Sequence, residues 1–296
     1  MLEELLTEQR NPASAAIDTV STEAALRIIN REDAKVAEAV EREIPAIARA
    51  VEAIAGALER GGRLFYLGAG TSGRLGVLDA AEIPPTFGAP ATLVTGIIAG
   101  GEPAVSRAAE ASEDDAAAGA RDLASRGFTA RDALVGLAAS GRTPYVLGAI
   151  AEARRLGAVT VGISCASGSR LERAAEIAVT PVVGPEVIAG STRLKAGTAQ
   201  KLVLNMLSTA VFIRLGYVYG NLMVNVQPKN SKLADRARRI IAAAGEVSEE
   251  RAAELLEASG GQVAVALVMS RKACGREAAE RSLAAAGGRV SAALSS

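Results

Sequence analysis

Residues 63–83 read RLFYLGAGTSGRLGVLDAAEI, and their pattern sets the architecture of the chain. An apolar strand at residues 63–67 leads into a glycine-rich turn at 68–73 and then a helix at 74–83. The alternation recurs: further strands are predicted at residues 91–95, 133–137, 159–164 and 177–182, and further helices at 115–125, 144–156 and 198–215. Such alternation predicts a parallel sheet with helices on both faces.

Outward from this centre the sequence predicts three regions. Residues 1–60 are predicted to be helical, residues 61–230 form the α/β domain, and residues 231–296 contain only short helices. In the last region Ser248 is a predicted N-cap for a helix at 249–257, and Gly287 and Gly288 are predicted to end the final helix. The expected fold class is α/β, a three-layer sandwich with a five-stranded parallel sheet, N-terminal helices and a small C-terminal helical domain.

Composition excludes several classes of protein. Lys plus Arg and Asp plus Glu are equal at 33 each, so no basic field attracts nucleic acid or an anionic membrane. No apolar run approaches the roughly 18 residues of a membrane span, and the first ten residues lack the apolar core of a signal peptide. Cys165 and Cys274 form no CxxC pair, which is typical of a reducing compartment. We expect a cytoplasmic protein without nucleic-acid or membrane partners.

The chain contains no histidine. This excludes Ser-His-Asp and Cys-His catalysis and histidine-ligated zinc. Acid–base chemistry must therefore use carboxylate, lysine, tyrosine or cysteine side chains. No metal and no cofactor are expected.

The glycine-rich turn matches the pattern G-x-G-x-x-G from Gly68 to Gly73. Alone, this is a weak dinucleotide fingerprint, because a ribose-binding acid is also required at the end of the second strand. Residues 95–100, TGIIAG, contain no carboxylate, so a dinucleotide site is disfavoured.

A phosphate monoester fits better, because hydroxyls and backbone N–H groups at helix starts bind phosphate. Ser72-Gly73-Arg74 and Ser140-Gly141-Arg142 each follow a predicted strand and open a helix, at the sheet edge where open α/β sheets bind ligands. Capping alone would also explain Thr143, which precedes Pro144. The candidate phosphate-binding residues are Thr71, Ser72, Gly73, Ser140, Gly141, Arg142 and Thr143.

These motifs resemble those of the N-acetylmuramic acid 6-phosphate etherases. The matching stretches are residues 67–87, 98–114, 138–146 and 186–201, and the similarity runs from residues 7–12 to residues 266–269. Asn225 and Ala264 depart from the aspartate and lysine expected in relatives. The resemblance implies a sugar isomerase (SIS) domain, a ubiquitin-associated-like C-terminal helical domain and a homodimer.

The resemblance also implies the reaction: N-acetylmuramic acid 6-phosphate and water give N-acetylglucosamine 6-phosphate and D-lactate, in the recycling of cell-wall amino sugars. It makes Glu82 the proton donor, and the second catalytic glutamate lies in the segment matching Glu113. Lys195 and Lys232 are candidates for neutralising the phosphate or the lactate carboxylate, although lysines are usually solubilising surface residues. Ser191 is a further candidate that helix capping would explain equally well.

The surroundings of the two glutamates predict different roles. Glu82 is expected in the last turn of a helix stopped by Pro84 and Pro85, where the helix dipole and Asp79 disfavour ionisation. Glu113 is expected in the first turn of a helix capped by Ser112, where the dipole favours the anion. This pattern matches Glu82 as acid and Glu113 as base. Without the resemblance, a solvated carboxylate at a helix end and an acid at a helix start would be the preferred explanations of Glu82 and Glu113.

A helix of 1.5 Å rise per residue places Glu82 roughly 15 Å from Ser72 of the same chain. Either this helix is broken, with Gly76 as the candidate position, or Glu82 serves the phosphate loop of a partner subunit. The interpretation that we prefer is the shared site.

Two other functions remain open from the sequence. One is a sugar-phosphate isomerase on the same fold, although a histidine, a common ring-opening acid, is missing. The other is a non-enzymatic sugar-phosphate sensor, because the glucokinase regulatory protein resembles this family; that protein, however, carries two such domains. Release of D-lactate distinguishes the etherase from both.

Overall fold

The computed structural model describes residues 6–107, 110–226 and 231–295. Two compact units form: Met1–Ala81 with Thr92–Ser208, and Glu82–Ala91 with Thr209–Ser296. Two of the three unit boundaries fall within long helices, α3 (Gly70–Phe87) and α8 (Lys195–Arg214), and the third lies between Ala91 and Thr92.

The first unit contains the predicted sheet. Its strands are β1 (Leu64–Gly68), β2 (Val94–Ile98), β3 (Ala133–Leu137), β4 (Val159–Ile163) and β5 (Ile177–Val179). They lie in the order β2-β1-β3-β4-β5, and every pairing is parallel. The five-stranded parallel sheet is thus confirmed. The strand β2 lies on one side of β1, and β3 and the later strands lie on the other side. The order in which the strands are added to the sheet therefore reverses between β1 and β3, and this position is a topological switch point.

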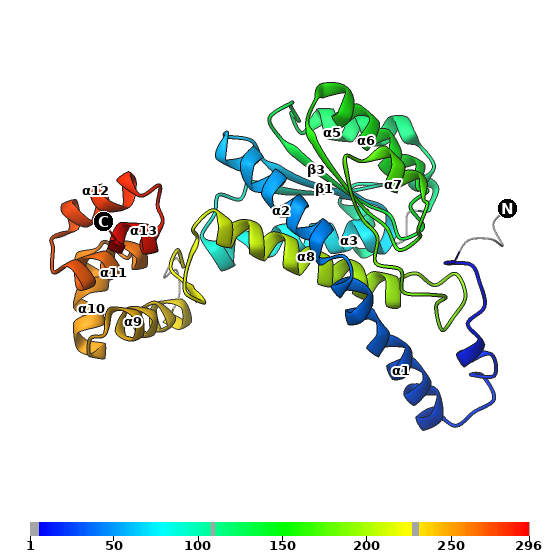
Figure 1. Ribbon diagram of the computed structural model, residues 1–296, viewed down its shortest axis with the longest axis horizontal. Helices are drawn as coiled ribbons and strands as arrows, with labels where there is room; N and C mark the ends of the chain where they lie inside the picture. Colours follow the sequence, from blue (N-terminus) through cyan, green and yellow to red (C-terminus); the bar gives the residue numbers. More distant parts are fainter. Residues whose placement is uncertain (1–5, 108–109, 227–230, 296) are drawn as a thin grey trace. The chain divides into compact units, whose positions relative to one another are not determined.

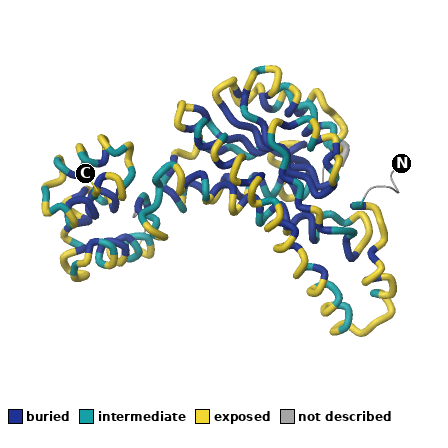
Figure 2. Tube along the Cα trace, viewed as in Figure 1, coloured by how far each residue is buried: buried dark blue, intermediate teal, exposed yellow. Residues whose placement is uncertain are grey.

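Helices cover both faces of the sheet, giving the expected three layers (Figure 1). One face carries α5 (Ala116–Ser125), α6 (Pro144–Leu156) and α7 (Arg170–Ala174), and the other carries α2 (Ile44–Glu59), α3 and α8. Successive side chains of β1 point to opposite faces of the sheet. Phe65 and Leu67 join the core beneath α5 and α6, while Tyr66 lies against α3. Figure 2 shows the strands as the most continuously buried part of this unit.

Further elements of the first unit lie outside the sheet layers. The N-terminal part contains the 3-10 helix η2 (Pro12–Ser14) and the helix α1 (Thr22–Glu41). Between β2 and α5 lie the short helix α4 (Pro103–Ser106) and the 3-10 helix η3 (Glu110–Glu113).

The second unit is a helical domain with a small antiparallel hairpin, β6 (Val218–Tyr219) and β7 (Leu222–Met223). Its helices are α9 (Ser231–Gly245), α10 (Glu249–Ala258), α11 (Val263–Lys272), α12 (Arg276–Ala285) and α13 (Val290–Ser295). Helix α11 is buried from residue 263 to residue 269, so it forms the centre of this core. Ala264 packs there, and Gly88 packs against the backbone of Asn225.

Two local predictions for this unit have different outcomes. Ser248 is the N-cap of α10, and its hydroxyl accepts the N–H of Arg251, as predicted. Gly287 and Gly288 follow α12 with positive φ, but they do not end the final helix, because α13 comes after them. That part of the prediction is wrong: the glycine pair makes a turn and the chain resumes a helix at Val290.

Among the described residues, no single helix has the length and apolarity needed to cross a membrane. Helices α10 and α11 pass that test only as a pair, bent by 115°, and by length and composition alone. Much of α11 is buried inside the helical core.

Candidate active site

The two Ser-Gly-Arg loops leave neighbouring strands at the switch point. Gly68, the last residue of β1, pairs in register with Leu137, the last residue of β3. The turn into α3 is tight: a Cβ on Gly73 would lie 2.7 Å from Gly68 O and 2.7 Å from the side chain of Ile98. Only glycine fits there, so the start of α3 is held directly above the strand end.

The second loop is packed just as closely. Gly141 has a φ of +63°, and a Cβ there would lie 2.3 Å from Ser169 Oγ. Ser140 Oγ accepts the N–H of Arg142, so the hydroxyl keeps its own proton for donation. Thr143 is the N-cap residue of α6, yet its hydroxyl makes no capping hydrogen bond. Helix capping by its hydroxyl therefore does not explain why a threonine stands at position 143.

Ser72 has a partner that the sequence did not suggest. Its hydroxyl donates to Oε1 of Gln200 on α8 at 2.8 Å, and both side chains are buried. The Nε2 group of Gln200 is buried without a hydrogen-bond partner among the described residues. Thr71 also faces α8, because a Cβ on Gly197 would lie 3.4 Å from Thr71 Cγ2. The first turns of α3 and α8 therefore meet beside the first loop.

Glu113 reaches the site by a route different from the predicted one. It is the last residue of η3, and α5 begins only at Ala116, where Asp115 accepts the N–H of Ala118 as N-cap. The prediction that Ser112 caps a helix with Glu113 in its first turn is wrong. Instead, Glu113 Oε1 lies against another helix start: a Cβ on Gly70, the first residue of α3, would be 3.0 Å away. A helix N-terminus favours a carboxylate there.

Glu82 lies farther along α3 and is exposed. The helix continues to Phe87 with Pro84 and Pro85 inside it, so the prediction that the prolines stop it is wrong. The helix continues although the two prolines lack the N–H groups that would bond the carbonyls four residues earlier. The helix is also unbroken at Gly76. Twelve residues of rise separate Glu82 from Gly70, which is about 18 Å along the axis.

Asp79, one turn before Glu82, is buried. Burial raises the pKa of its carboxyl group, although contacts with Tyr66, Lys201 and Ser208 oppose the shift. The Nζ atom of Lys201 lies 3.8 Å from Asp79 Oδ1. Burial and the nearby lysine both weaken the negative charge of Asp79, on which the predicted difference between the two glutamates partly rested.

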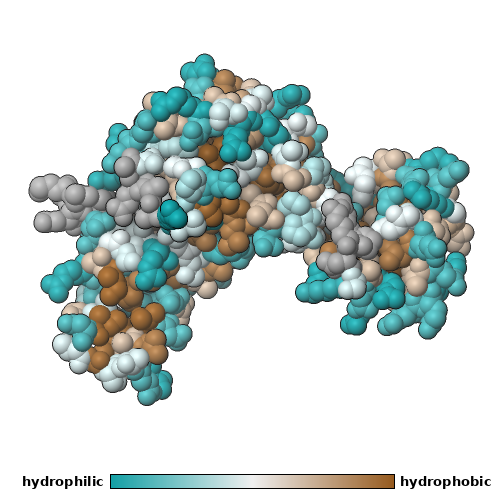
Figure 3. Space-filling view, turned by 180° about the vertical axis from the view of Figure 1, so that it is seen from behind, coloured by the Kyte–Doolittle hydropathy of each residue, from teal (hydrophilic) through white to brown (hydrophobic). Residues whose placement is uncertain are grey.

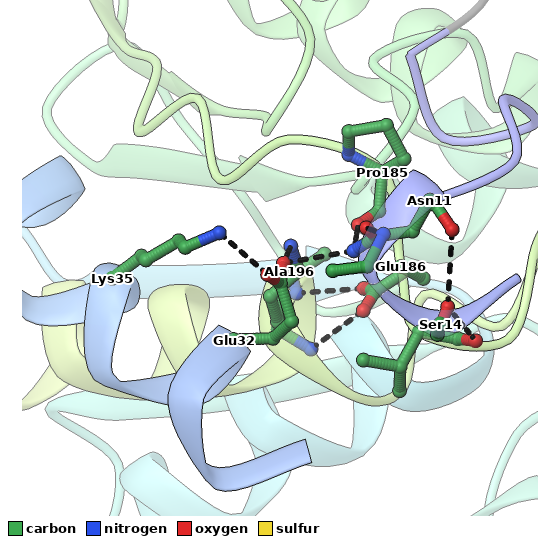
Figure 4. A network of polar contacts seen from close by, with 10 residues as sticks. Asn11, Ser14, Glu32, Lys35, Pro185, Glu186 and Ala196 are labelled. Atoms are coloured by element: carbon green, nitrogen blue, oxygen red, sulfur yellow. Dashed lines mark hydrogen bonds and ion pairs between the residues drawn. The ribbon is translucent and has the colours of Figure 1, made fainter. Parts of the chain in front are cut away.

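Lys195 has a different neighbourhood from the one expected. Its ammonium donates to Glu32 Oε2 of α1 at 2.8 Å, and both side chains are almost fully buried. The carboxylate of Glu186 accepts the backbone N–H groups of Lys195 and Ala196, so it already binds the start of α8 (Figure 4). This network connects the N-terminal arm (η2 and α1, residues 12–41) to α8. In it the charge of Lys195 is paired with the charge of Glu32.

Glu32 is the charged centre of the network. Burial would raise its pKa, but hydrogen bonds from Lys195, Lys35 and Asn11 outweigh burial and hold the pKa at about 2. Glu32 is therefore ionised at neutral pH.

The two other sequence candidates lie apart from the loops. Ser191 is half-buried in the turn that precedes α8, where its backbone N–H bonds Ile188 O. Lys232 is exposed on α9 in the second unit, where it lines a surface pocket with Arg236 and Arg239. No group of three or more Cys, Asp or Glu side chains in the described ranges is arranged to hold a metal ion.

The sequence is similar to a known domain family and, over most of its length, to proteins of known function. The family model of the glucokinase regulatory protein N-terminal SIS domain matches residues 46–154. The N-acetylmuramic acid 6-phosphate etherase of Edwardsiella ictaluri is 57% identical over 90% of this chain and 89% of that protein. The etherase of Caldanaerobacter subterraneus subsp. tengcongensis is 50% identical over 99% of this chain and 96% of its own length.

Among solved structures, a phosphoheptose isomerase from Neisseria gonorrhoeae overlaps 64% of this chain and 98% of its own, with 16% identity and a TM-score of 0.48.

Proposed function

This chain belongs to the N-acetylmuramic acid 6-phosphate etherase family, and we propose that its active site forms where the loops after β1 and β3 meet Glu113. The protein is a lyase: it cleaves the D-lactyl ether of N-acetylmuramic acid 6-phosphate, giving N-acetylglucosamine 6-phosphate and D-lactate in amino-sugar recycling. The observation that carries the site assignment is the contact of Glu113 with the first residue of α3.

The chemistry needs one base and one acid. Ring opening exposes an aldehyde at C1, which acidifies the hydrogen on C2. A base removes that proton, the C3–O bond breaks, and the departing lactate oxygen takes a proton from an acid. Water then adds to C3 and a proton returns to C2. Two carboxyl groups that exchange protonation states complete both halves.

The two loops are suited to the 6-phosphate. Ser140 and Thr143 have hydroxyls that no cap uses, and α3 and α6 begin at the same sheet edge. The start of α8 is less suited, because the Glu186 carboxylate already occupies it. We assign the phosphate to the loops at residues 71–73 and 140–143, and we leave Lys195 and Lys232 out of the phosphate site.

Glu113 is the better base of the two glutamates. It lies beside the phosphate loop, so the sugar carbons near the phosphate are within its reach. Glu82 is then the acid that protonates lactate.

Glu82 requires a second subunit in this proposal. About 18 Å of continuous helix separates it from Gly70, whereas C3 of the sugar lies only a few bonds from the phosphate. A homodimer in which Glu82 of one subunit serves the loops of the other resolves the mismatch. The first unit has apolar surface for such contacts: Leu26 on α1 is 60% exposed, and Figure 3 shows apolar side chains gathered on this arm.

Mixed subunits test the shared site. Glu82→Gln and Ser72→Ala/Ser140→Ala are each expected to be inactive as homodimers. Verified heterodimers of the two regain one intact centre and release D-lactate. Heterodimers that stay inactive refute the shared site.

Substrate comparison tests the phosphate assignment. Unphosphorylated N-acetylmuramic acid is expected to react far more slowly than its 6-phosphate at equal concentration. Equal kcat/KM values for the two sugars overturn the assignment, and a purified wild-type protein that releases no D-lactate overturns the activity itself. We further propose that the protein works in the cytoplasm, as the absence of a CxxC pair among its two cysteines favours.

A further inference from the structure

The side chain of Arg74 bridges α3 to the segment that leads to Glu113. Its Nε donates to Val105 O at 3.0 Å, and its Nη2 donates to Arg107 O at 2.8 Å. Val105 belongs to α4, and Arg107 follows it directly. One guanidinium thus fixes two backbone carbonyls a few residues before η3.

Arg74 and Gly70 lie on the same side of α3, because residues four apart in a helix are neighbours on its surface. Gly70 meets the carboxylate of Glu113, and Arg74 meets the carbonyls at residues 105 and 107. The first turns of α3 therefore contact residues 105 and 107 through Arg74 and contact Glu113 at Gly70. With the strand end behind it, α3 supports both of these contacts.

We propose that Arg74 is a positioning residue that holds the Glu113 carboxylate at the start of α3 by anchoring residues 105–107. The proposal rests on the proposed role of Glu113 as base. It gives the two Ser-Gly-Arg loops different uses: the arginine of the first loop bonds main-chain carbonyls, whereas the second loop places the exposed Arg142 beside Ser140.

The geometry requires arginine. The planar guanidinium presents several N–H donors in a fixed fork, so Nε and Nη2 bond two carbonyls together. A lysine ammonium is a point charge on a flexible stem and does not reproduce the fork. Arg74→Lys therefore keeps the positive charge but loses the paired hydrogen bonds to the two carbonyls.

Arg74→Lys is expected to lower kcat for D-lactate release about 10- to 100-fold, the loss typical of a reacting group displaced by about 1 Å. Binding of the product N-acetylglucosamine 6-phosphate, measured by calorimetry, keeps wild-type stoichiometry and affinity within about twofold, because Arg74 bonds the carbonyls of Val105 and Arg107 and residues 71–73 and 140–143 are unchanged. Unchanged stoichiometry excludes a loss of folded sites as the cause. In a Glu113→Asp background the added loss is much smaller, because the carboxylate is already displaced.

Arg155→Lys is the matched control, because this arginine pairs on the surface of α6 with Glu152; its kcat stays at the wild-type value. Arg74→Gln, which also lacks the fork, is the second variant if Arg74→Lys does not fold. Wild-type kcat in either folded variant overturns the proposal, as does product affinity that falls along with kcat, which makes Arg74 a ligand contact. Failure of the proposed function is a separate result, because the wild-type protein then releases no D-lactate.

Discussion

The carboxylate of Glu113 lies against Gly70, so that a Cβ on this glycine would come within 3.0 Å of Glu113 Oε1. Gly70 opens α3 with a φ of +52°, directly after the strand that sets the phosphate loops. One backbone position therefore links the proposed base to the proposed phosphate site.

Gly70→Ala tests this link. The added methyl group pushes the Glu113 carboxylate away, and the left-handed backbone adds about 1–2 kcal/mol of strain. We expect kcat to fall at least about tenfold. Gly157→Ala is the control: φ is +79° and no atom lies within 4 Å of the new Cβ, so it shares the strain without the contact. Equal kcat values for the two variants contradict the link.

The pairing of Ser72 with Gln200 combines a structural and a binding role, which a double variant separates. With phosphate bound, the single proton of the Ser72 hydroxyl turns from Gln200 Oε1 to the phosphate, so Ser72→Ala removes this donor and is expected to raise KM about tenfold. It also leaves Gln200 Oε1 buried and unpaired, at a cost of about 1–2 kcal/mol in the free energy of unfolding. Ser72→Ala/Gln200→Met restores the stability but not KM. Recovery of KM in the double variant shows that Ser72 acts only through packing.

The fold could be predicted from local sequence patterns, whereas close contacts between segments distant in the sequence could not. The second strand was predicted at residues 91–95 but spans Val94–Ile98. Gly96 lies in the middle of this strand, where a Cβ would be 2.6 Å from Val77 Cα of α3. The glycine serves helix packing, and nothing in the neighbouring sequence signals that.

The residues of the site could be predicted from the sequence, whereas the contacts that bring them together could not. Hydroxyl loops after strands and the etherase-like motifs identified the residues. The contact of Glu113 with Gly70 depends on how the chain folds over α3, so a local capping argument chose the wrong helix for it. Likewise Lys195 was a plausible phosphate ligand until α1 supplied Glu32 as its partner, 163 positions away along the chain.

The buried Glu32–Lys195 pair predicts a dependence of stability on pH. The pKa of Glu32 is held at about 2, below its ordinary value of 4.5, so its contribution is complete above pH 4.5 and is lost as the pH falls toward 2. Glu32→Gln is expected to reduce the free energy of unfolding by about 3 kcal/mol at pH 7, because it leaves Lys195 buried without its partner.

Denaturant unfolding as a function of pH measures this effect. The difference between wild type and Glu32→Gln should shrink below pH 4.5. Glu23→Gln, which removes an exposed pair with Arg27 on the same helix, should change stability by less than about 0.5 kcal/mol at any pH. A Glu32→Gln variant as stable as Glu23→Gln contradicts the assigned charge pair.

Deuterium exchange at C2 of the sugar, followed by NMR in D₂O with N-acetylmuramic acid 6-phosphate, tests the central assignment of base and acid most directly. The account predicts that Glu82→Gln releases no D-lactate yet still exchanges the C2 hydrogen, because Glu113 removes that proton without help from the acid. Glu113→Gln is predicted to lose both exchange and lactate release. Wild-type C2 exchange in folded Glu113→Gln would contradict the assignment and remove Glu113 as the base.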